Sequence, residues 1–236
     1  MAWDPVWEKI FASRSWGRYP GEELVRFVAR NFYDAPDRAA VKFLELGCGP
    51  GPNLWFLARE GFTAYGIDGS PSALSQARAR LNQEVPNWHG ALVQGELLHL
   101  PFPDNSFDAL IDNEAVSCNS FEDACQIYAE ARRVLKPGGK LFVRTFATGC
   151  WGECTGTPAG HNAWFVSEGP LAGEGIARFT REEDISLLLD EFESVEHAKL
   201  ELIRNPGKFS IKEWLITAIT SKAPVLTSLR FTKTNR

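Results

Sequence analysis

The feature that most constrains this sequence is a short apolar run that ends in three glycines at alternate positions, Phe43-Leu-Glu-Leu-Gly-Cys-Gly-Pro-Gly51. The pattern over 41–46 is that of a buried strand, and helical spacing of apolar residues resumes at Leu54. Because glycine has no Cβ, a strand that turns through such a loop into a helix lets its backbone approach a ligand closely. The run therefore predicts an α/β fold that binds a ligand where its first strand ends.

Apolar runs of strand length alternate with helical patterns through the middle of the chain, as the βαβ units of a parallel sheet require. The expected strands are 41–46, 63–67, 91–94, 107–111 and 141–146, and the expected helices are 22–32, 54–60, 71–82 and 123–135. A further helix is expected near Thr180, after about thirty residues rich in Gly, Trp and Cys.

The C-terminal part of the pattern allows two interpretations. Residues 198–203 and 211–219 flank Asn205-Pro206-Gly207 and favour a hairpin, although Ser210 and Glu213 also have the spacing of a helix capping box. With the hairpin preferred, the expected fold is a Rossmann-like three-layer sandwich. Its sheet is seven-stranded and mostly parallel, with an antiparallel C-terminal hairpin.

Size and charge narrow the class of protein. A chain of 236 residues suits one domain, 1–236, and its net charge of −5 includes no basic block, so we expect no nucleic-acid partner. No stretch approaches a membrane-spanning helix, and the first residues lack the pattern of a signal peptide, so a cytoplasmic location is expected. The five cysteines show no disulfide spacing, and Cys150 and Cys154 lack further ligands nearby, so no metal site is expected.

The glycine loop distinguishes between cofactors. The dinucleotide fingerprint G-x-G-x-x-G requires Gly or Ala at its last position. Counted from Gly47 that position is Pro52, and counted from Gly49 it is Leu54. A nicotinamide-dinucleotide oxidoreductase is therefore disfavoured.

The loop instead resembles motif I of the class I S-adenosylmethionine-dependent methyltransferases, in their small-molecule, type 11-like branch, because Glu45 stands two residues before the first glycine. The resemblance continues at Gly66-Ile-Asp68, at Gln94-Gly95-Glu96, at Leu100 to Asp108, and at Arg133-Val-Leu-Lys-Pro-Gly-Gly139. It covers residues 41–146. One departure is Glu96, where the family usually has Asp.

The resemblance implies S-adenosylmethionine as cofactor, with S-adenosylhomocysteine as product, and assigns roles to individual residues. Asp68 would accept from the ribose hydroxyls, Glu96 would contact adenine, and Asn113 would accept from the ammonium group. In relatives with a similar start, a segment such as Trp16 to Pro20 lies across the cofactor, so residues 1–40 are expected to form a helical lid. The full set of expected cofactor contacts is Arg18, Tyr19, Glu45, Gly47, Cys48, Gly49, Gly51, Asp68, Gly69, Gly95, Glu96, Leu97 and Asn113.

Methyl transfer from a sulfonium needs alignment in a dry pocket, and needs a base only where the acceptor must lose a proton. Residues near the ends of the fourth and fifth strands can supply one, and His161 and Glu114 are the candidates, followed by Glu153. We expect the insertion 147–180 to contribute to the acceptor pocket, with an aromatic wall from Trp151, Trp164 and Phe165.

These expectations describe an enzyme that moves a methyl group to a small-molecule acceptor, on oxygen or nitrogen, by direct displacement. A metabolite, a sugar or a lipid-linked precursor would fit. The DNA amino-methylating motif is missing, since Asp112-Asn-Glu-Ala115 stands in its place. An inactive regulatory subunit that binds S-adenosylmethionine is the alternative from another class. The acceptor, the atom methylated, the oligomeric state and the pathway are not encoded in these patterns.

Overall fold

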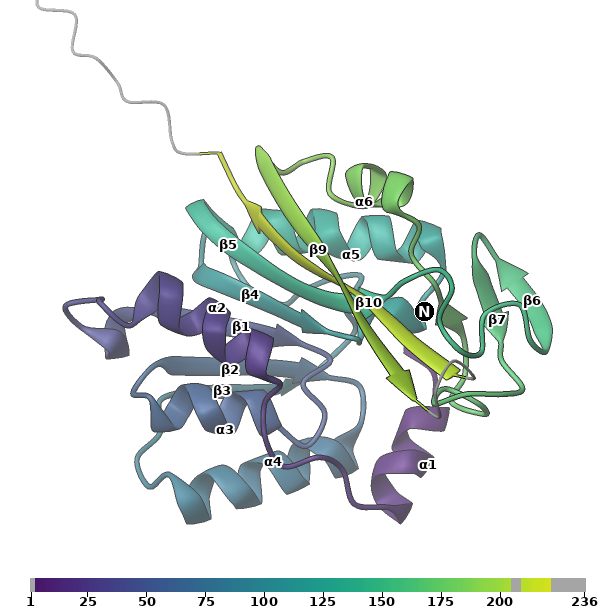
Figure 1. Cartoon of the computed structure of the whole chain (residues 1–236). Helices are drawn as coiled ribbons and strands as arrows, with labels where there is room; N and C mark the ends of the chain where they lie inside the picture. The colour runs from purple at the N-terminus through teal and green to yellow at the C-terminus, as the bar shows by residue number, and fades with distance from the viewer. Residues whose placement is uncertain (1–2, 205–208, 222–236) are drawn as a thin grey trace, which may run out of the picture.

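A computed structural model describes residues 3–204 and 209–221, and its centre is a seven-stranded sheet (Figure 1). The order is β3-β2-β1-β4-β5-β10-β9, in which only the pairs formed by β10 are antiparallel. The strand bounds are β1 Lys42–Leu46, β2 Thr63–Asp68, β3 Gly90–Gln94, β4 Phe107–Asn113, β5 Leu135–Phe146, β9 Ser194–Arg204 and β10 Phe209–Ile219. This order confirms the expected fold class. β9 and β10 pair as antiparallel strands, so the hairpin interpretation of the C-terminal pattern is confirmed and the helix capping box is wrong. The expected turn at 205–207 lies outside the described residues.

Helices cover both faces of the sheet and make the outer layers of the sandwich. One core joins the sheet to α2 Glu22–Phe32, α3 Pro52–Arg59 and α4 Pro71–Glu84, and the other joins it to α5 Phe121–Val134 and α6 Glu182–Leu188. Neighbours in a strand alternate between the cores: Leu141 and Val143 pack against α5, while Phe142 packs against the α2 side. This alternation is the period of two that a strand buried on both faces imposes.

Several boundaries differ from the sequence-based expectation. β4 extends two residues beyond the expected 107–111, so that Asn113 is the last residue of the strand. β5 begins at Leu135, because Pro137-Gly138-Gly139 is accommodated in the strand, beside a register shift in its pairing with β4. The Trp-rich start, for which the sequence pattern gives no helix bounds, contains α1 Val6–Ser13, which packs on α4.

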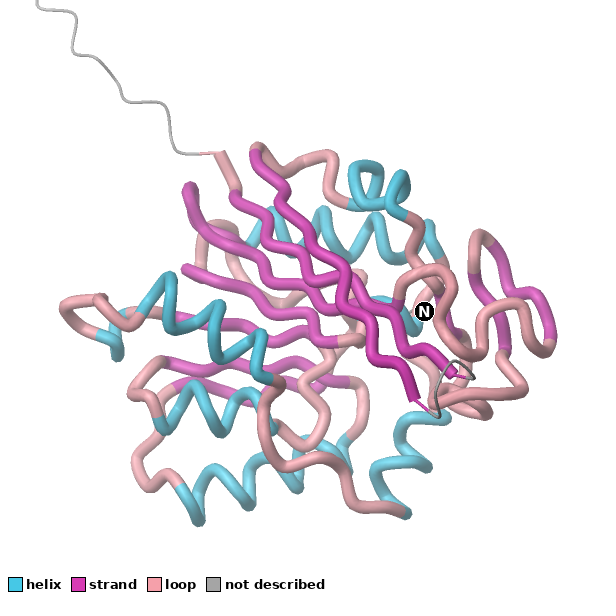
Figure 2. Tube along the Cα trace, in the orientation of Figure 1, coloured by secondary structure: helices cyan, strands magenta, loops and turns pink. Residues whose placement is uncertain are grey.

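The insertion is more regular than its composition indicates. It forms a three-stranded sheet, β6 Thr157–Gly160, β7 Ala163–Phe165 and β8 Ala177–Arg178, which lies at one end of the molecule (Figure 2). A core of five buried residues joins it to the end of β5 at Phe146. Short 3-10 turns, η1 Arg38–Ala40 and η2 Val116–Cys118, complete the described elements.

Candidate active site

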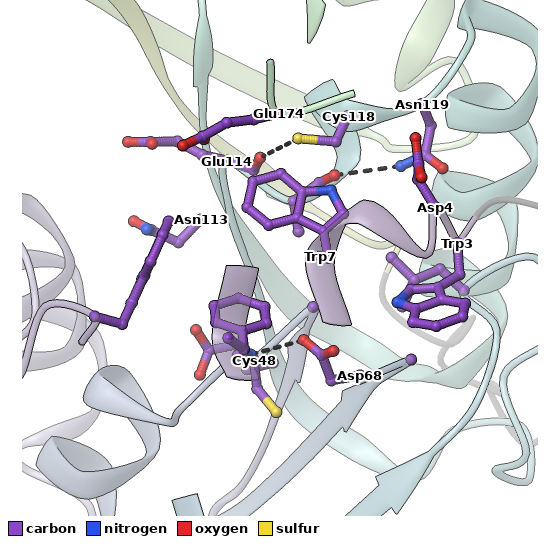
Figure 3. A pocket seen from close by; sticks show the side chains of 18 of the residues that line it. Trp3, Asp4, Trp7, Cys48, Asp68, Asn113, Glu114, Cys118, Asn119 and Glu174 are labelled. Carbon is purple, nitrogen blue, oxygen red and sulfur yellow. Dashed lines mark hydrogen bonds between the residues drawn. The ribbon is translucent and has the colours of Figure 1, made fainter. Parts of the chain in front are cut away.

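A cavity lies at the carboxyl ends of β1, β2 and β4, where open α/β sheets bind their ligands (Figure 3). Residues from the glycine loop form its floor, α1 and the residues flanking it form one wall, and the insertion closes it at Leu171 and Glu174. Its other polar and apolar lining residues are Trp3, Asp4, Trp7, Phe11, Trp16, Glu45, Gly47, Cys48, Gly49, Pro52, Asn53, Asp68, Gly69, Gly95, Leu97, Asn113, Glu114, Ala115, Cys118, Asn119 and Phe146.

The glycine loop follows β1 and requires glycine at two positions for different reasons. Gly47 has φ +61° and packs so closely on Ala115 that a Cβ would overlap that side chain. Gly49 has φ +51°, and its Cβ would lie 3.3 Å from the Phe11 ring of α1. Left-handed backbone disfavours other residues. The loop therefore stays thin between β4 and α1, and its backbone faces the cavity.

Glu45 lies in β1 directly behind the loop, and only 3% of its surface is exposed. Its Oε1 accepts a 2.6 Å hydrogen bond from Asn53 Nδ2, while its Oε2 has no partner among the described residues. Burial raises the pKa of Glu45 to about 8, although the Asn53 hydrogen bond opposes the shift. The cavity thus contains a buried oxygen to which no described residue donates, and which a ligand, a water molecule or a proton can satisfy.

Asp68 is the last residue of β2, and both of its oxygens bind backbone. Oδ2 accepts from Gly49 N at 2.8 Å and Oδ1 accepts from Ser70 N at 2.8 Å. Burial raises the pKa of Asp68, and the backbone donors counteract part of that effect. A carboxylate fixed in this way ties the loop after β1 to the loop after β2.

The segment 3–17, which we call the N-terminal strap, lies across this end of the sheet. The Trp3 indole rests on Gly69, where a Cβ would overlap the ring, and Trp3 N donates to Glu96 Oε2 at 3.2 Å. Glu8 of α1 accepts from the hydroxyls of Ser70 and Ser72 at the start of α4. The strap is thereby attached to the elements that follow β2 and β3.

Glu114 lines the cavity just after β4 and has φ +67°, an uncommon conformation for a residue with a side chain. Its carboxylate is 3.2 Å from Arg144 Nε, but that guanidinium also holds Glu213 through bonds of 2.7–2.9 Å. Desolvation in the cavity wall raises the pKa of Glu114 to about 7, with Arg144 acting in the opposite direction and Glu213 adding to the rise. Such a group can exchange a proton near neutral pH.

Two further polar side chains complete the inner wall. Cys118 donates its thiol hydrogen to Glu114 O, and burial raises its pKa to about 12, so the thiol stays protonated. Asn119 donates from Nδ2 to Ala115 O at 3.2 Å. Its Oδ1 is buried and has no partner in the described part of the chain.

Nine of the thirteen expected cofactor residues line this cavity, and four do not. Arg18 pairs with Glu84, and Tyr19 is 69% exposed with its ring edge on Trp55, so both lie away from the cavity. Gly51 is at the start of α3 against Ala77, and Glu96 contacts the strap. Among the strap residues that line the cavity, Trp16 belongs to the segment expected across the cofactor. The others, Trp3, Asp4, Trp7 and Phe11, are not among the expected contacts.

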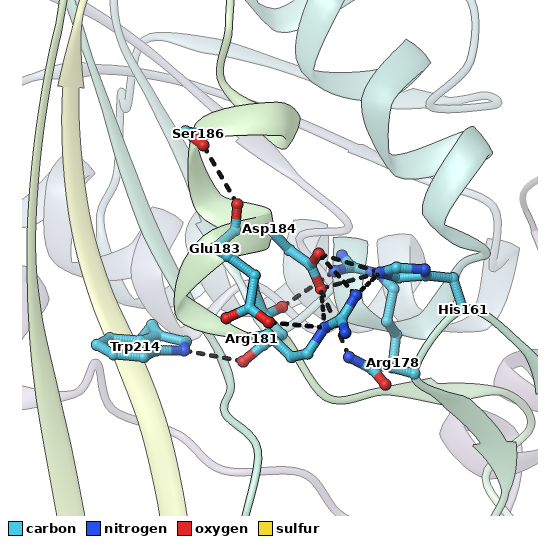
Figure 4. Close-up of polar contacts among 9 residues, drawn as sticks. His161, Arg178, Arg181, Glu183, Asp184, Ser186 and Trp214 are labelled. Carbon is cyan, nitrogen blue, oxygen red and sulfur yellow. Dashed lines mark hydrogen bonds and ion pairs between the residues drawn. The ribbon is translucent and has the colours of Figure 1, made fainter.

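The second catalytic candidate, His161, lies outside the cavity in a polar cluster on the insertion (Figure 4). Its Nε2 is 3.0 Å from both oxygens of the buried Asp184 and 2.9 Å from Arg181 Nη2, and its ring packs on Phe121. The cluster fastens β6 and β7 to α6. Glu153, Trp151, Trp164 and Phe165 are also absent from the cavity lining. Within the insertion, Glu153 accepts from Gly149 N and the Trp164 ring packs on Phe179, whereas the Trp151 ring packs on Phe209 of β10 and Phe165 is exposed.

In the ranges 3–204 and 209–221, no three His, Cys, Asp or Glu side chains come together as metal ligands would. Likewise, none of the helices described is both long and apolar enough to cross a bilayer.

Together, the sheet order and a glycine loop tied to an acid at the end of the second strand define a Rossmann-like nucleoside-binding domain. Known proteins identify it further. The methyltransferase domain family matches residues 44–143. Residues 44–143 therefore carry a methyltransferase domain, and their glycine loop, Asp68 and sheet order resemble those of the class I, S-adenosylmethionine-dependent methyltransferases.

Curated relatives agree over the same part of the chain. Methyltransferase GfsG of Streptomyces halstedii is 34% identical over 106 residues, covering 44% of this chain and 37% of that protein. Demethylmenaquinone methyltransferase of Tropheryma whipplei is 38% identical over 110 residues, covering 46% and 43%. The matches span less than half the length of these relatives.

Solved structures extend the likeness in fold beyond that region. A SAM-dependent methyltransferase from Methanosarcina mazei has a TM-score of 0.65 at 23% identity, over 77% of this chain and 93% of that one. The likeness in fold therefore extends beyond residues 44–143.

Proposed function

We propose that this chain transfers a methyl group from S-adenosylmethionine to a small-molecule acceptor, bound in the cavity between the glycine loop and the N-terminal strap. The observation that carries the proposal is the unpartnered Oε2 of Glu45, buried beside a glycine loop and Asp68 in a methyltransferase domain. When bound, the cofactor supplies a methyl group activated on a sulfonium. The chain as a whole acts as one methyltransferase domain in this proposal.

The residues present fit the chemistry of that cofactor. Glu45 offers an acceptor oxygen to an ammonium group, the thin loop at Gly47 and Gly49 lets backbone approach the amino-acid and ribose parts, and Asp68 would receive the ribose hydroxyls. Leu97 and Gly69 provide the apolar surfaces that an adenine requires. In this arrangement Trp3, which rests on Gly69, borders the adenine side of the site.

The acceptor would occupy the part of the cavity between the strap and η2, away from the glycine loop. Leu171 and the aromatic rings of the strap exclude water there, which strengthens electrostatic interactions within the site. Glu114 is the side chain positioned to take up a proton from the acceptor, and Arg144 holds it in place. His161 has no part in this proposal, because its ring is committed to Asp184.

Calorimetric titration with S-adenosylmethionine, S-adenosylhomocysteine and NAD tests the cofactor assignment. Saturable binding of the first two and no binding of NAD is expected, and the opposite pattern would contradict the proposal. Release of S-adenosylhomocysteine with a panel of acceptors separates an enzyme from a regulatory subunit that only binds the cofactor.

A further inference from the structure

The cavity walls hold acidic side chains and no basic ones among the described lining residues. Five carboxyl side chains line the cavity, those of Asp4, Glu45, Asp68, Glu114 and Glu174, and no Lys, Arg or His is among the described lining residues. Glu45 and Asp68 lie on the cofactor side. The other three, together with the unpartnered Oδ1 of Asn119, surround the space left for the acceptor. An acceptor that brings hydrogen-bond donors and positive charge complements these walls.

The cations near the wall neutralise it only in part. Arg144 makes its bidentate contact with Glu213 and reaches Glu114 only through Nε, so one guanidinium serves two carboxylates. Glu174 pairs with Arg14 at the mouth of the cavity, while the Asp4 carboxylate accepts only from the backbone of Val6 and has no ion pair among the described contacts. An anionic acceptor would meet uncompensated negative charge here.

The opposite wall is aromatic and belongs to the strap. Trp7, Phe11 and Trp16 form one cluster, with ring centroids 5.2–6.2 Å apart. Aromatic faces attract ammonium and guanidinium groups through the ring quadrupole. The chain itself uses this property at the edge of the wall, where the Arg14 guanidinium lies 5.7 Å from the Trp16 centroid while it pairs with Glu174.

We propose that the acceptor is a small amine that enters as its ammonium cation and binds between the aromatic wall of the strap and the carboxylates of Asp4 and Glu114. This inference rests on the proposed function, since it names the substrate class of the same site. Sugars and alcohols without an amino group would also find acceptor oxygens here, but they would leave the carboxylates without a countercharge.

The reaction balances with groups that the proposal already contains. Glu114 takes one proton from the ammonium, which frees the nitrogen lone pair. That pair forms the bond to the methyl carbon as the bond between this carbon and sulfur breaks, and the sulfur keeps the bonding electrons. The products are a methylated ammonium, S-adenosylhomocysteine and a protonated Glu114, which returns its proton to solvent.

Matched acceptors provide the first test. Purified enzyme with S-adenosylmethionine is given pairs of compounds that share a carbon skeleton and differ only in carrying an amino or a hydroxyl group, and S-adenosylhomocysteine release is measured. Saturable turnover is expected from amines and not from their hydroxyl partners. Turnover on hydroxyl compounds alone, or no saturable turnover on any amine, would overturn the amine assignment. Because cofactor binding is measured separately by calorimetry, such a result leaves the proposed function standing.

Variants provide the second test. Glu114→Gln should lower kcat/KM for the best amine by at least tenfold at pH 7, and Trp7→Leu should raise its KM about tenfold. The dissociation constant of S-adenosylhomocysteine should stay within twofold in the Glu114 variant. Glu191→Gln is the matched control, since this exposed carboxylate precedes β9 at the opposite end of the sheet. Equal effects in Glu114→Gln and the control would contradict the assignment.

A cation that cannot be methylated separates binding from folding. Benzyltrimethylammonium should bind the complex of enzyme and S-adenosylhomocysteine, inhibit amine turnover competitively, and bind at least fivefold more weakly to Trp7→Leu. Its failure to compete at concentrations that bind elsewhere would overturn the cation site, even if Trp7→Leu proved too unstable to purify.

Discussion

Raising the pH should destabilise this fold through Glu45, and one substitution isolates the effect. Burial raises the pKa of Glu45 from 4.5 to about 8. Between these values the unfolded chain releases the proton while the folded chain retains it. Folding therefore takes up a proton, and the free energy of unfolding falls as the pH rises through this window. In Glu45→Gln the side chain does not titrate, so this contribution disappears.

The size of the effect follows from the pH interval. One retained proton corresponds to a slope of about 1.4 kcal/mol per pH unit. Between pH 5.5 and 7.5 the wild-type protein should therefore lose about 2–3 kcal/mol more of its free energy of unfolding than Glu45→Gln. The amide can still accept from Asn53, as Oε1 does in the structure.

Urea unfolding followed by tryptophan fluorescence at pH 5.5, 6.5 and 7.5, without cofactor, measures the difference. Burial also raises the pKa values of Asp68 and Asp112, but both groups are present in the two proteins, so the comparison isolates Glu45. Parallel pH dependences would refute the reasoning, because they would mean that Glu45 is already ionised in the folded chain.

Three other predictions follow from the contacts. Asp68→Ala should weaken S-adenosylhomocysteine binding at least a hundredfold by calorimetry, since two charge-assisted bonds are lost; an unchanged dissociation constant would remove Asp68 from the site. Gly69→Ala should displace Trp3, because the added Cβ overlaps its ring, and trypsin should then cleave at Lys9 or Arg14 faster than in wild type. His161→Ala should lower the free energy of unfolding by about 1–3 kcal/mol by removing a partner of buried Asp184, and leave methyl transfer unchanged. Lost transfer with unchanged stability would restore His161 as a catalytic candidate.

The parallel strands could be predicted because each is a continuous apolar run, buried on both faces, between glycine or helical signals. The loop from Gly47 to Gly51 was equally readable, since its glycines adopt positive φ values that few other residues tolerate. Local signals of this kind depend only on neighbouring residues. They were sufficient for the strands of the central sheet and for the floor of the cavity, but not for α1 or the three strands of the insertion.

The walls of the cavity depend on contacts between distant segments, which no local pattern records. The pKa of Glu114 depends on its neighbours Arg144 and Glu213, which are 69 residues apart in the sequence. His161 looked like a base because nothing in the sequence shows its partner Asp184. The pattern predicts Tyr19 at the cofactor, yet its ring packs on Trp55, and the strap brings the earlier Trp3 and Trp7 to the cavity. The density of tryptophan there was the available signal.

The strap also links two affinities. Its first described residue, Trp3, rests on the glycine that follows β2, and four residues later Trp7 lines the cavity beyond the glycine loop. Because both rings belong to one short segment held by Glu8, a shift of the strap at either place moves the other. Coupling of this kind is reciprocal: whatever factor the first ligand adds to the binding of the second, the second adds to the first. Replacing the strap with a different sequence would therefore change the acceptor preference and the affinity for the cofactor together.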